Sequence, residues 1–152
     1  MAASRRAGRR DARRARRPAS ERLARMAARV LAWEGARGAC VEITLLDAAA
    51  MRRLNRRATG RRGLTDVIAY ALPVAGGLVG DVYICPEAAA RWVARTAPGA
   101  RSLFEELVRL TVHGTLHVLG YDHPEGPARM RSAMWRRQEG YMRRLLDTRG
   151  GR

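Results

Sequence analysis

All three histidines of the chain lie in one short segment, HGTLHVLGYDH, which runs from His113 to His123. His113 and His117 are four positions apart, so on a helix both imidazoles leave from the same face. Gly120 can end that helix and let the chain turn back, which would bring His123 close to the other two. Three converging neutral imidazoles are typical of zinc sites, and only three protein ligands leave the fourth position open, as in catalytic zinc sites. The spacing predicts one zinc ion per chain, held by His113, His117 and His123.

Two other interpretations of this segment compete with a zinc site. Partly buried histidines without a metal are common, but that interpretation suits a single histidine on a helix face better than three. The spacing HxxxHxxGxxH also occurs in metzincin proteases, in which a Glu follows the first His and acts as the general base. Here that position is Gly114, so the sequence disfavours peptide hydrolysis.

The charge of the chain favours a polyanionic partner. Its formal net charge is +16, and all 30 basic residues are Arg. Such an excess attracts RNA or DNA, with an acidic membrane surface as the weaker alternative. No apolar run approaches the roughly 20 residues of a membrane span, and no apolar segment follows the basic N-terminus as in a secretory signal. We therefore expect a cytoplasmic protein that does not act at a membrane.

The pattern of the remaining chain predicts one small domain in which helices and strands are mixed. Residues 1–19 contain eight Arg and one Asp without an apolar stripe, so we expect a disordered basic arm, which either attracts nucleic acid or is a solvated tail. Ser20 is the predicted N-cap of the first helix, and residues 149–152 form a short tail. Apolar periodicity predicts helices at 20–34, 48–55, 86–96, 102–119 and 127–147, and strands at 40–47, 67–73 and 79–85.

Four segments resemble the YbeY family of zinc-dependent endoribonucleases and ribosomal RNA maturation factors. HGTLHVLGYDH is similar to the family signature HGxLHLxGYDH. In the same order as in the family, LNRRATGRRGLTDVIAY resembles its LN…TDVLSF block, GLVGDVYICPE its LGDIxIxxE block, and MWRRQEGYM the Mxxx(Q)E tail of its last helix. The resemblance implies an α+β fold, with a mixed β-sheet packed with helices and the zinc site on a helix and the following loop. It assigns residues 20–148 to a YbeY-like ribonuclease domain.

The resemblance also implies a function. It predicts a single-strand-specific endoribonuclease, a hydrolase with zinc as cofactor, that acts on ribosomal RNA in maturation and ribosome quality control. The implied partners are RNA and the ribosome or its small subunit. Many family members carry an Arg that matters for cleavage four positions after the Asn of the LN block, where this chain has Thr59. This departure favours the alternative of a zinc-containing maturation factor that binds RNA or the ribosome and cleaves nothing. A metal-dependent hydrolase of another substrate is a third possibility.

The loop that follows the LN block supplies candidate RNA-binding residues. Zinc lowers the pKa of a bound water from about 15.7 toward ~7 and polarises phosphoryl oxygens, which suits phosphodiester cleavage. The charge that develops in such a reaction needs nearby cations. We predict that RNA contacts Arg56, Arg57, Arg61 and Arg62, and that Arg57 and Arg61 also act in catalysis. The alternative is a solvated basic loop.

Several further side chains have predicted roles that follow from their local setting. Asp122 is a candidate catalytic residue, which could orient a ligand imidazole or accept a proton, or it could simply be a turn residue. Asp66 is interpreted as a turn or cap residue, and Glu139 as a surface or helix-pairing residue. The tryptophans at helical positions are interpreted as core or core-edge residues and not as platforms for base stacking: Trp33, Trp92 and Trp135.

Overall fold

The computed structural model describes the backbone of residues 2–147, together with the side chains of residues 10, 12 and 14–147. The tail predicted at 149–152 and the last residue of the predicted domain, Thr148, lie outside the described residues. The elements in chain order are α1 (Ala2–Trp33), β1 (Ala39–Leu45), α2 (Ala48–Thr59), β2 (Val67–Val74), β3 (Gly77–Ile84), α3 (Pro86–Thr96), α4 (Leu103–Val118), a 3-10 helix η1 (Gly126–Arg131) and α5 (Ala133–Asp147).

The three strands form one mixed sheet in the order β1-β3-β2. Strands β2 and β3 form an antiparallel hairpin, in which Val74 pairs with Gly77 across the turn. Strand β1 pairs with β3 in parallel. Alternate residues of β1 point to one face, where Val41 and Ile43 are buried, because side chains alternate along a strand. The predicted α+β fold with a mixed sheet is confirmed.

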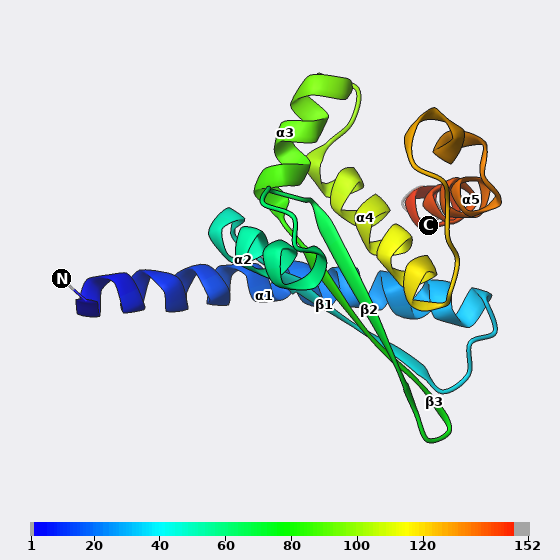
Figure 1. Ribbon diagram of the computed structural model, residues 1–152, viewed down its shortest axis with the longest axis horizontal. Coiled ribbons are helices and arrows are strands. Elements are labelled where there is room, and N and C mark those ends of the chain that lie inside the picture. Colours follow the sequence, from blue (N-terminus) through cyan, green and yellow to red (C-terminus); the bar gives the residue numbers. More distant parts are fainter. Residues whose placement is uncertain (1, 148–152) are drawn as a thin grey trace.

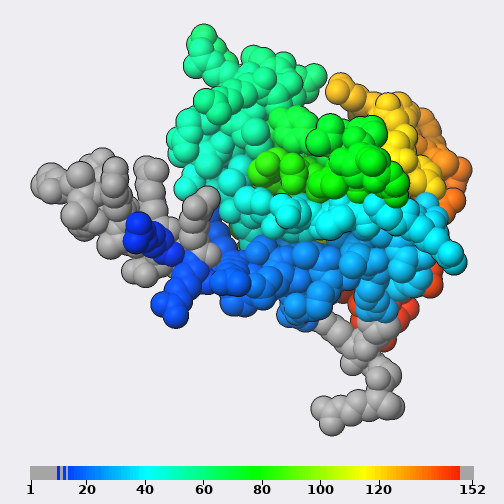
Figure 2. Space-filling view, turned by 90° about the horizontal axis from the view of Figure 1, so that it is seen from below, coloured from blue at the N-terminus to red at the C-terminus, as the bar shows by residue number. Residues whose placement is uncertain are grey.

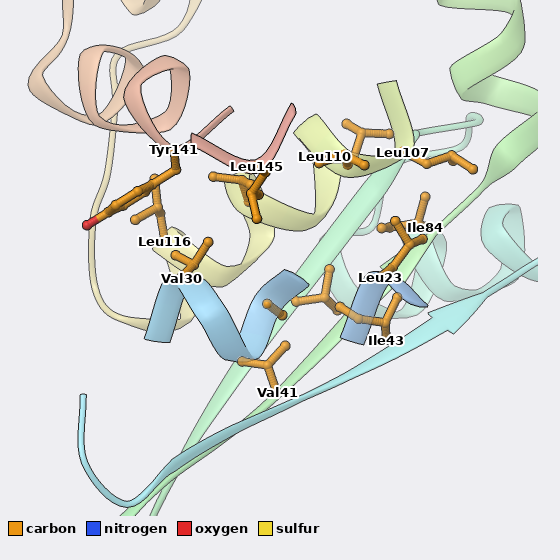
Figure 3. Packing of buried hydrophobic residues seen from close by; sticks show 14 of the residues in the cluster. Leu23, Val30, Val41, Ile43, Ile84, Leu107, Leu110, Leu116, Tyr141 and Leu145 are labelled. Atoms are coloured by element: carbon orange, nitrogen blue, oxygen red, sulfur yellow. The ribbon is translucent and has the colours of Figure 1, made fainter. Parts of the chain in front are cut away.

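Helices α1 and α4 cover the apolar face of this sheet, and α5 packs against α4 on the side away from the sheet (Figure 1). Side chains from all these layers meet in one core (Figure 3). Helix α4 is its centre, because 11 of its 16 residues are buried. A helix that is apolar on nearly all sides is a buried helix. The two histidines near its C-terminal end therefore stand on a rigid support. The labelled core residues are Leu23, Val30, Val41, Ile43, Ile84, Leu107, Leu110, Leu116, Tyr141 and Leu145.

Two glycines let α4 lie very close to strand β3. A Cβ at Gly114 would be 2.5 Å from Cγ1 and 3.0 Å from Cγ2 of Val82, which is itself fully buried. A Cβ at Gly80 would be 2.5 Å from Cγ1 of Val118. Gly114, the residue after the first histidine, therefore lies directly against the sheet. A Glu at this position, as in the metzincin proteases, would have no room for its side chain.

We expect Gly114→Ala to lower the free energy of unfolding by about 1–3 kcal/mol through overpacking, although Ala favours a helix by about 1 kcal/mol over Gly. Urea unfolding of the metal-free chain measures this loss. Val82→Ala removes the two methyl groups that the new Cβ meets, so the double variant should be more stable than the sum of the single losses predicts. Purely additive losses would contradict the proposed close contact.

The basic N-terminal segment is helical and not a disordered arm, so that prediction is corrected. Helix α1 begins at Ala2 and continues through Pro18 (Figure 1). The segment consists mostly of Ala and Arg, which are among the best helix formers, and this propensity outweighs the single hydrogen bond that Pro18 cannot donate. Ser20 is consequently not an N-cap. Its hydroxyl donates to the carbonyl of Arg17 at 2.9 Å, within the helix.

The long C-terminal helix predicted at 127–147 is also corrected, because the chain breaks it into two. Ser132 has an extended backbone (φ −72°, ψ 156°) between η1 and α5. Its Oγ accepts a hydrogen bond from the amide of Trp135 at 3.1 Å, as an N-cap hydroxyl does.

In the part of the chain that the structure describes, no helix is both long and apolar enough to cross a membrane.

Candidate metal centre and adjoining cleft

The structure brings the three histidines together at the C-terminal end of α4. His113 and His117 lie on the last turns of the helix. Gly120 has a positive φ of 93°, and the amide of Tyr121 donates to the carbonyl of Leu116 at 3.0 Å. This left-handed turn ends the helix and sends the chain back, so that His123 reaches the other two.

The three imidazoles converge through their Nε2 atoms. The Nε2 of His113 lies 3.0 Å from that of His117 and 3.4 Å from that of His123. One ligand atom from each residue lies within 4.8 Å of the others. Tetrahedral zinc with Zn–N bonds of about 2.0–2.1 Å separates its nitrogen ligands by roughly 3.3 Å. The spacing of the nitrogens therefore suits a small divalent cation.

Each imidazole uses its other nitrogen to hydrogen-bond an oxygen atom. Such acceptors place the proton on Nδ1, so the three Nε2 lone pairs face one another without a proton between them. That arrangement is repulsive unless a cation lies among them, and the residues present therefore fit a metal. The Nδ1 acceptors are the side-chain Oε1 of Gln138 for His113 at 2.8 Å, the carbonyl of Tyr121 for His117 at 2.9 Å, and the carbonyl of Pro124 for His123 at 3.0 Å.

The protein environment keeps two of these ligands neutral. Burial lowers the pKa of His113 to about 3, and the charges of His117, Arg129 and His123 act in the same direction, against the hydrogen bond to Gln138. Burial also lowers the pKa of His117. A neutral imidazole is the form that binds a metal, so both are ready to bind one at neutral pH.

These shifts predict that the metal-free chain loses stability as the pH falls below about 6.5. In that range the unfolded state binds protons that folded His113 refuses, so stability is present above about pH 6.5 and declines toward pH 3. We expect a loss of about 1.4 kcal/mol per pH unit from His113, with His117 adding in the same direction. Urea unfolding in EDTA at pH 7.5, 6.0 and 5.0 measures the slope. The matched control is His113→Asn, and an equal slope in that variant would contradict the assignment.

The first ligand is held by a polar chain that runs across the contact between α4 and α5. Gln138 is 1% exposed, and its Nε2 donates to Glu139 at 3.3 Å. Arg109 in turn donates to both carboxylate oxygens of Glu139, at 2.9 and 3.3 Å. Burial alone would raise the pKa of Glu139, but the hydrogen bond and charge of Arg109 lower it. The helix-pairing interpretation of Glu139 is confirmed, whereas the role of Gln138 was missed.

The loop between the second and third ligands is tied to the end of α1. The hydroxyl of Tyr121, whose carbonyl holds His117, donates to Glu34 at 2.7 Å. Tyr141 and Arg137 donate to the same carboxylate. Burial would raise the pKa of Glu34, but these hydrogen bonds lower it. The first helix therefore helps to set the position of the loop between α4 and η1, residues 119–125, here called the metal loop.

The predicted RNA-binding arginines lie on the surface at the end of α2 and in the loop after it. Arg61 lies near the metal loop. Its Nη2 is 3.9 Å from a carboxylate oxygen of Glu125, two residues after His123, and both side chains are largely exposed. Such a pair is weak, but it shows that the two loops are neighbours. The side chains of Arg56, Arg57 and Arg62 are exposed.

Thr59, which stands at the position of the family Arg, ends helix α2. Its hydroxyl donates to the carbonyl of Asn55 at 2.8 Å and accepts from the amide of Arg61 at 3.2 Å. It therefore supplies structure and no positive charge. Asp122 is exposed, and its Oδ1 accepts from the amide of His123 at 2.8 Å. This contact is that of a turn residue, and a catalytic role for Asp122 stays a prediction.

A cleft of about 530 Å³ opens beside the histidines, with His113 in its wall. Asp66 lies at its edge just before β2, and burial raises the pKa of this carboxyl. Trp92 is 43% exposed and lines the cleft, so the interpretation of that tryptophan as a core or core-edge residue is wrong. The other charged and polar residues of the wall are Thr96, Arg101, Glu106, Arg109, Arg129 and Gln138.

The fold and the converging histidines define a small α+β protein with a candidate metal centre at the end of its central helix. The family model described as "Endoribonuclease YbeY" matches residues 10–146. The chain therefore belongs to the YbeY family.

Curated relatives carry the same description. A protein called "Endoribonuclease YbeY" from Anaeromyxobacter sp. is 42% identical over 115 residues, which are 74% of this chain and 58% of that protein. Proteins of the same name from Streptomyces coelicolor and Mycobacterium tuberculosis are each 40% identical, over 96 and 100 residues; these matches cover 56% and 57% of this chain. The chain spans between a half and two thirds of the length of these relatives.

The fold is also similar to a solved structure, the solution structure of TM1509 from Thermotoga maritima. The TM-score is 0.58 with 23% sequence identity, and the match covers 86% of this chain and 83% of the other. This likeness concerns the fold alone.

Proposed function

We propose that the chain is a zinc-dependent, single-strand-specific endoribonuclease that acts in the cytoplasm on ribosomal RNA, in maturation and in ribosome quality control. Its partners in this proposal are RNA and the ribosome or its small subunit. The observation that carries the proposal is the convergence of three Nε2 atoms, with that of His113 lying 3.0 and 3.4 Å from the other two. The names of the relatives support an RNA substrate.

In this proposal the three histidines hold one zinc ion per chain. When bound there, zinc supplies Lewis-acid chemistry that suits cleavage of a phosphodiester by water or by a ribose hydroxyl. Gln138 and the carbonyls of Tyr121 and Pro124 keep the imidazoles in the ligating tautomer.

The chain's own cations and Asp122 complete the proposed site. Arg57 and Arg61 neutralise charge on the reacting phosphate, and Arg56 and Arg62 hold the RNA backbone beside it. Asp122 accepts a proton or steadies the metal loop. The domain boundaries belong to the same proposal, with residues 20–148 as the ribonuclease and the basic N-terminal segment attracting RNA without sequence preference.

One observation favours a second candidate function, a zinc-containing maturation factor that binds RNA or the ribosome without cleaving it. Thr59 is fully engaged in ending α2, so the position that carries a catalytic Arg in many members offers no charge here. The two candidates share the metal site and differ in turnover.

Metal analysis of the full chain, paired with a cleavage assay on single-stranded and duplex segments of ribosomal RNA, separates these functions. Near one zinc per chain, with cleavage of the single strand that EDTA abolishes and zinc restores, is the expected result. Zinc without any cleavage would replace the enzyme by the maturation factor. A chain without zinc would remove both.

A further inference from the structure

The cleft beside His113 is lined by one arginine that forms no salt bridge with the described residues. The guanidinium of Arg129 takes part in no ion pair or hydrogen bond among the residues that the structure describes, and its Nε is shielded from solvent without an acceptor. Buried N–H groups nearly always find an acceptor in native proteins. A ligand that brings an anionic oxygen into the cleft would provide one.

The other arginines of the cleft are already committed to carboxylates. Arg101 lies 3.0 Å from Glu106, and Arg109 pairs with both Glu106 and Glu139. Their positive charge is therefore largely balanced within the protein. Arg129 is the cation of this cleft that remains available for a ligand.

The backbone of Arg129 is well fixed although its side-chain N–H groups lack acceptors. Helix η1 begins three residues after His123, and the carbonyl of Arg129 accepts from the amide and the hydroxyl of Ser132 at 3.1 and 2.7 Å. The guanidinium carbon lies 5.8 Å from the centre of the Trp135 ring, a distance at which the ring face attracts a cation. The side chain is thus held beside the cleft before any ligand arrives.

The charge of Arg129 reaches the candidate metal centre. It is among the charges that lower the pKa of His113 and of His117, and it acts on Asp66 as well. Its side chain lines the same cleft as His113, so it can attract an anion to the cleft side of the candidate metal centre. Arginine is well suited to this role because its planar N–H groups match the oxygens of a phosphate.

We propose that Arg129 binds the RNA phosphodiester that enters the cleft beside the metal centre, and so supplies the positive charge that Thr59 does not. The inference rests on the proposed function and names a residue for its substrate. In this proposal the positive charge comes from the segment that follows the third histidine in the sequence, whereas the LN block precedes the histidine segment.

The test compares Arg129→Gln and Arg129→Lys with Arg131→Gln in the full-length, zinc-loaded chain. Arg131 lies on the same 3-10 helix, is exposed and loses the same charge, so it controls for the overall electrostatic attraction. We expect Arg129→Gln to lower kcat/KM on single-stranded RNA about 100-fold, as the loss of one transition-state donor does. Arg129→Lys should recover only part of this, because Lys lacks the planar donors. Arg131→Gln should stay within about threefold of the wild type.

A binding measurement keeps the inference separate from the proposed function. Fluorescence anisotropy with a 2′-O-methyl single-stranded oligonucleotide reports RNA binding, since the probe lacks the ribose nucleophile, and a denaturing gel of the same sample checks that water has not cleaved the strand. Here Arg129→Gln should weaken binding about tenfold and Arg131→Gln about twofold. If the wild type binds but cleaves nothing, the proposed enzyme fails and this difference still decides the role of Arg129. Equal losses in Arg129→Gln and Arg131→Gln, with both variants folded by circular dichroism, would overturn it.

Discussion

The His117→Ala chain is expected to retain less than about one tenth of the zinc of the wild type and to lose at least about 1000-fold in RNA cleavage. Removing the imidazole of His117 leaves two ligand nitrogens, and the Nε2 of His113 then loses its neighbour at 3.0 Å. The affinity of such a site depends on the full ligand set because each nitrogen replaces a water of the ion. Metal analysis after dialysis, followed by the cleavage assay, gives both values.

Thermal unfolding provides the control for misfolding. A bound ion that the unfolded chain does not bind raises the melting temperature by mass action. Added zinc should therefore raise the Tm of the wild type and leave that of His117→Ala unchanged, while the two metal-free chains melt within a few degrees of each other. Stoichiometric zinc in His117→Ala would show that the site lies elsewhere.

The second large effect concerns Arg109, which joins two carboxylates at the contact between α4 and α5. Its own side chain is 14% exposed, and that of Glu106 is 4% exposed. Arg109→Leu leaves these carboxylates buried with less compensation, and breaking a buried pair from one side typically costs about 3–5 kcal/mol. We expect a loss near 3 kcal/mol, because Glu106 keeps Arg101. Urea unfolding of the metal-free chain measures it.

Two comparisons test this explanation. Arg91→Leu removes an exposed arginine and should change the free energy of unfolding by less than about 0.5 kcal/mol. The triple variant Arg109→Leu, Glu106→Gln and Glu139→Gln removes the uncompensated charges together with their partner, so it should be more stable than Arg109→Leu alone. A triple variant less stable than Arg109→Leu would show that packing and not charge accounts for the loss.

The sequence predicted those features that depend on short-range patterns. Alternation in β1 and the apolar run of α4 are local signals, and the spacing of His113, His117 and His123 needs only one helix and one turn to bring the three together. The prediction of α5 was incomplete because the hydroxyl of Ser132 competes with the helix and ends η1. The helical state of residues 2–19 was missed because a charged segment without an apolar stripe favours disorder, whereas here the intrinsic helix propensity of Ala and Arg prevails.

The residues around the ligands could not be predicted because they depend on packing between distant segments. Gln138 reaches His113 only when α5 lies against α4, although its place in the noted MWRRQEGYM segment was a usable signal. Arg129 lies on η1, which the sequence pattern did not separate from α5. Nothing local in the sequence distinguishes Arg129 from the many other arginines.

The length of α1 has a consequence for the size of the proposed RNA substrate. A helix of 32 residues is about 48 Å long, and its N-terminal half extends beyond the sheet and the other helices (Figures 1 and 2). Its C-terminal end lies at the metal loop, since Glu34 follows it directly and binds Tyr121. The Arg-rich end and the histidines are therefore at opposite ends of a rod. A short oligonucleotide can occupy one end only, whereas a long strand can lie along the helix and be held at both.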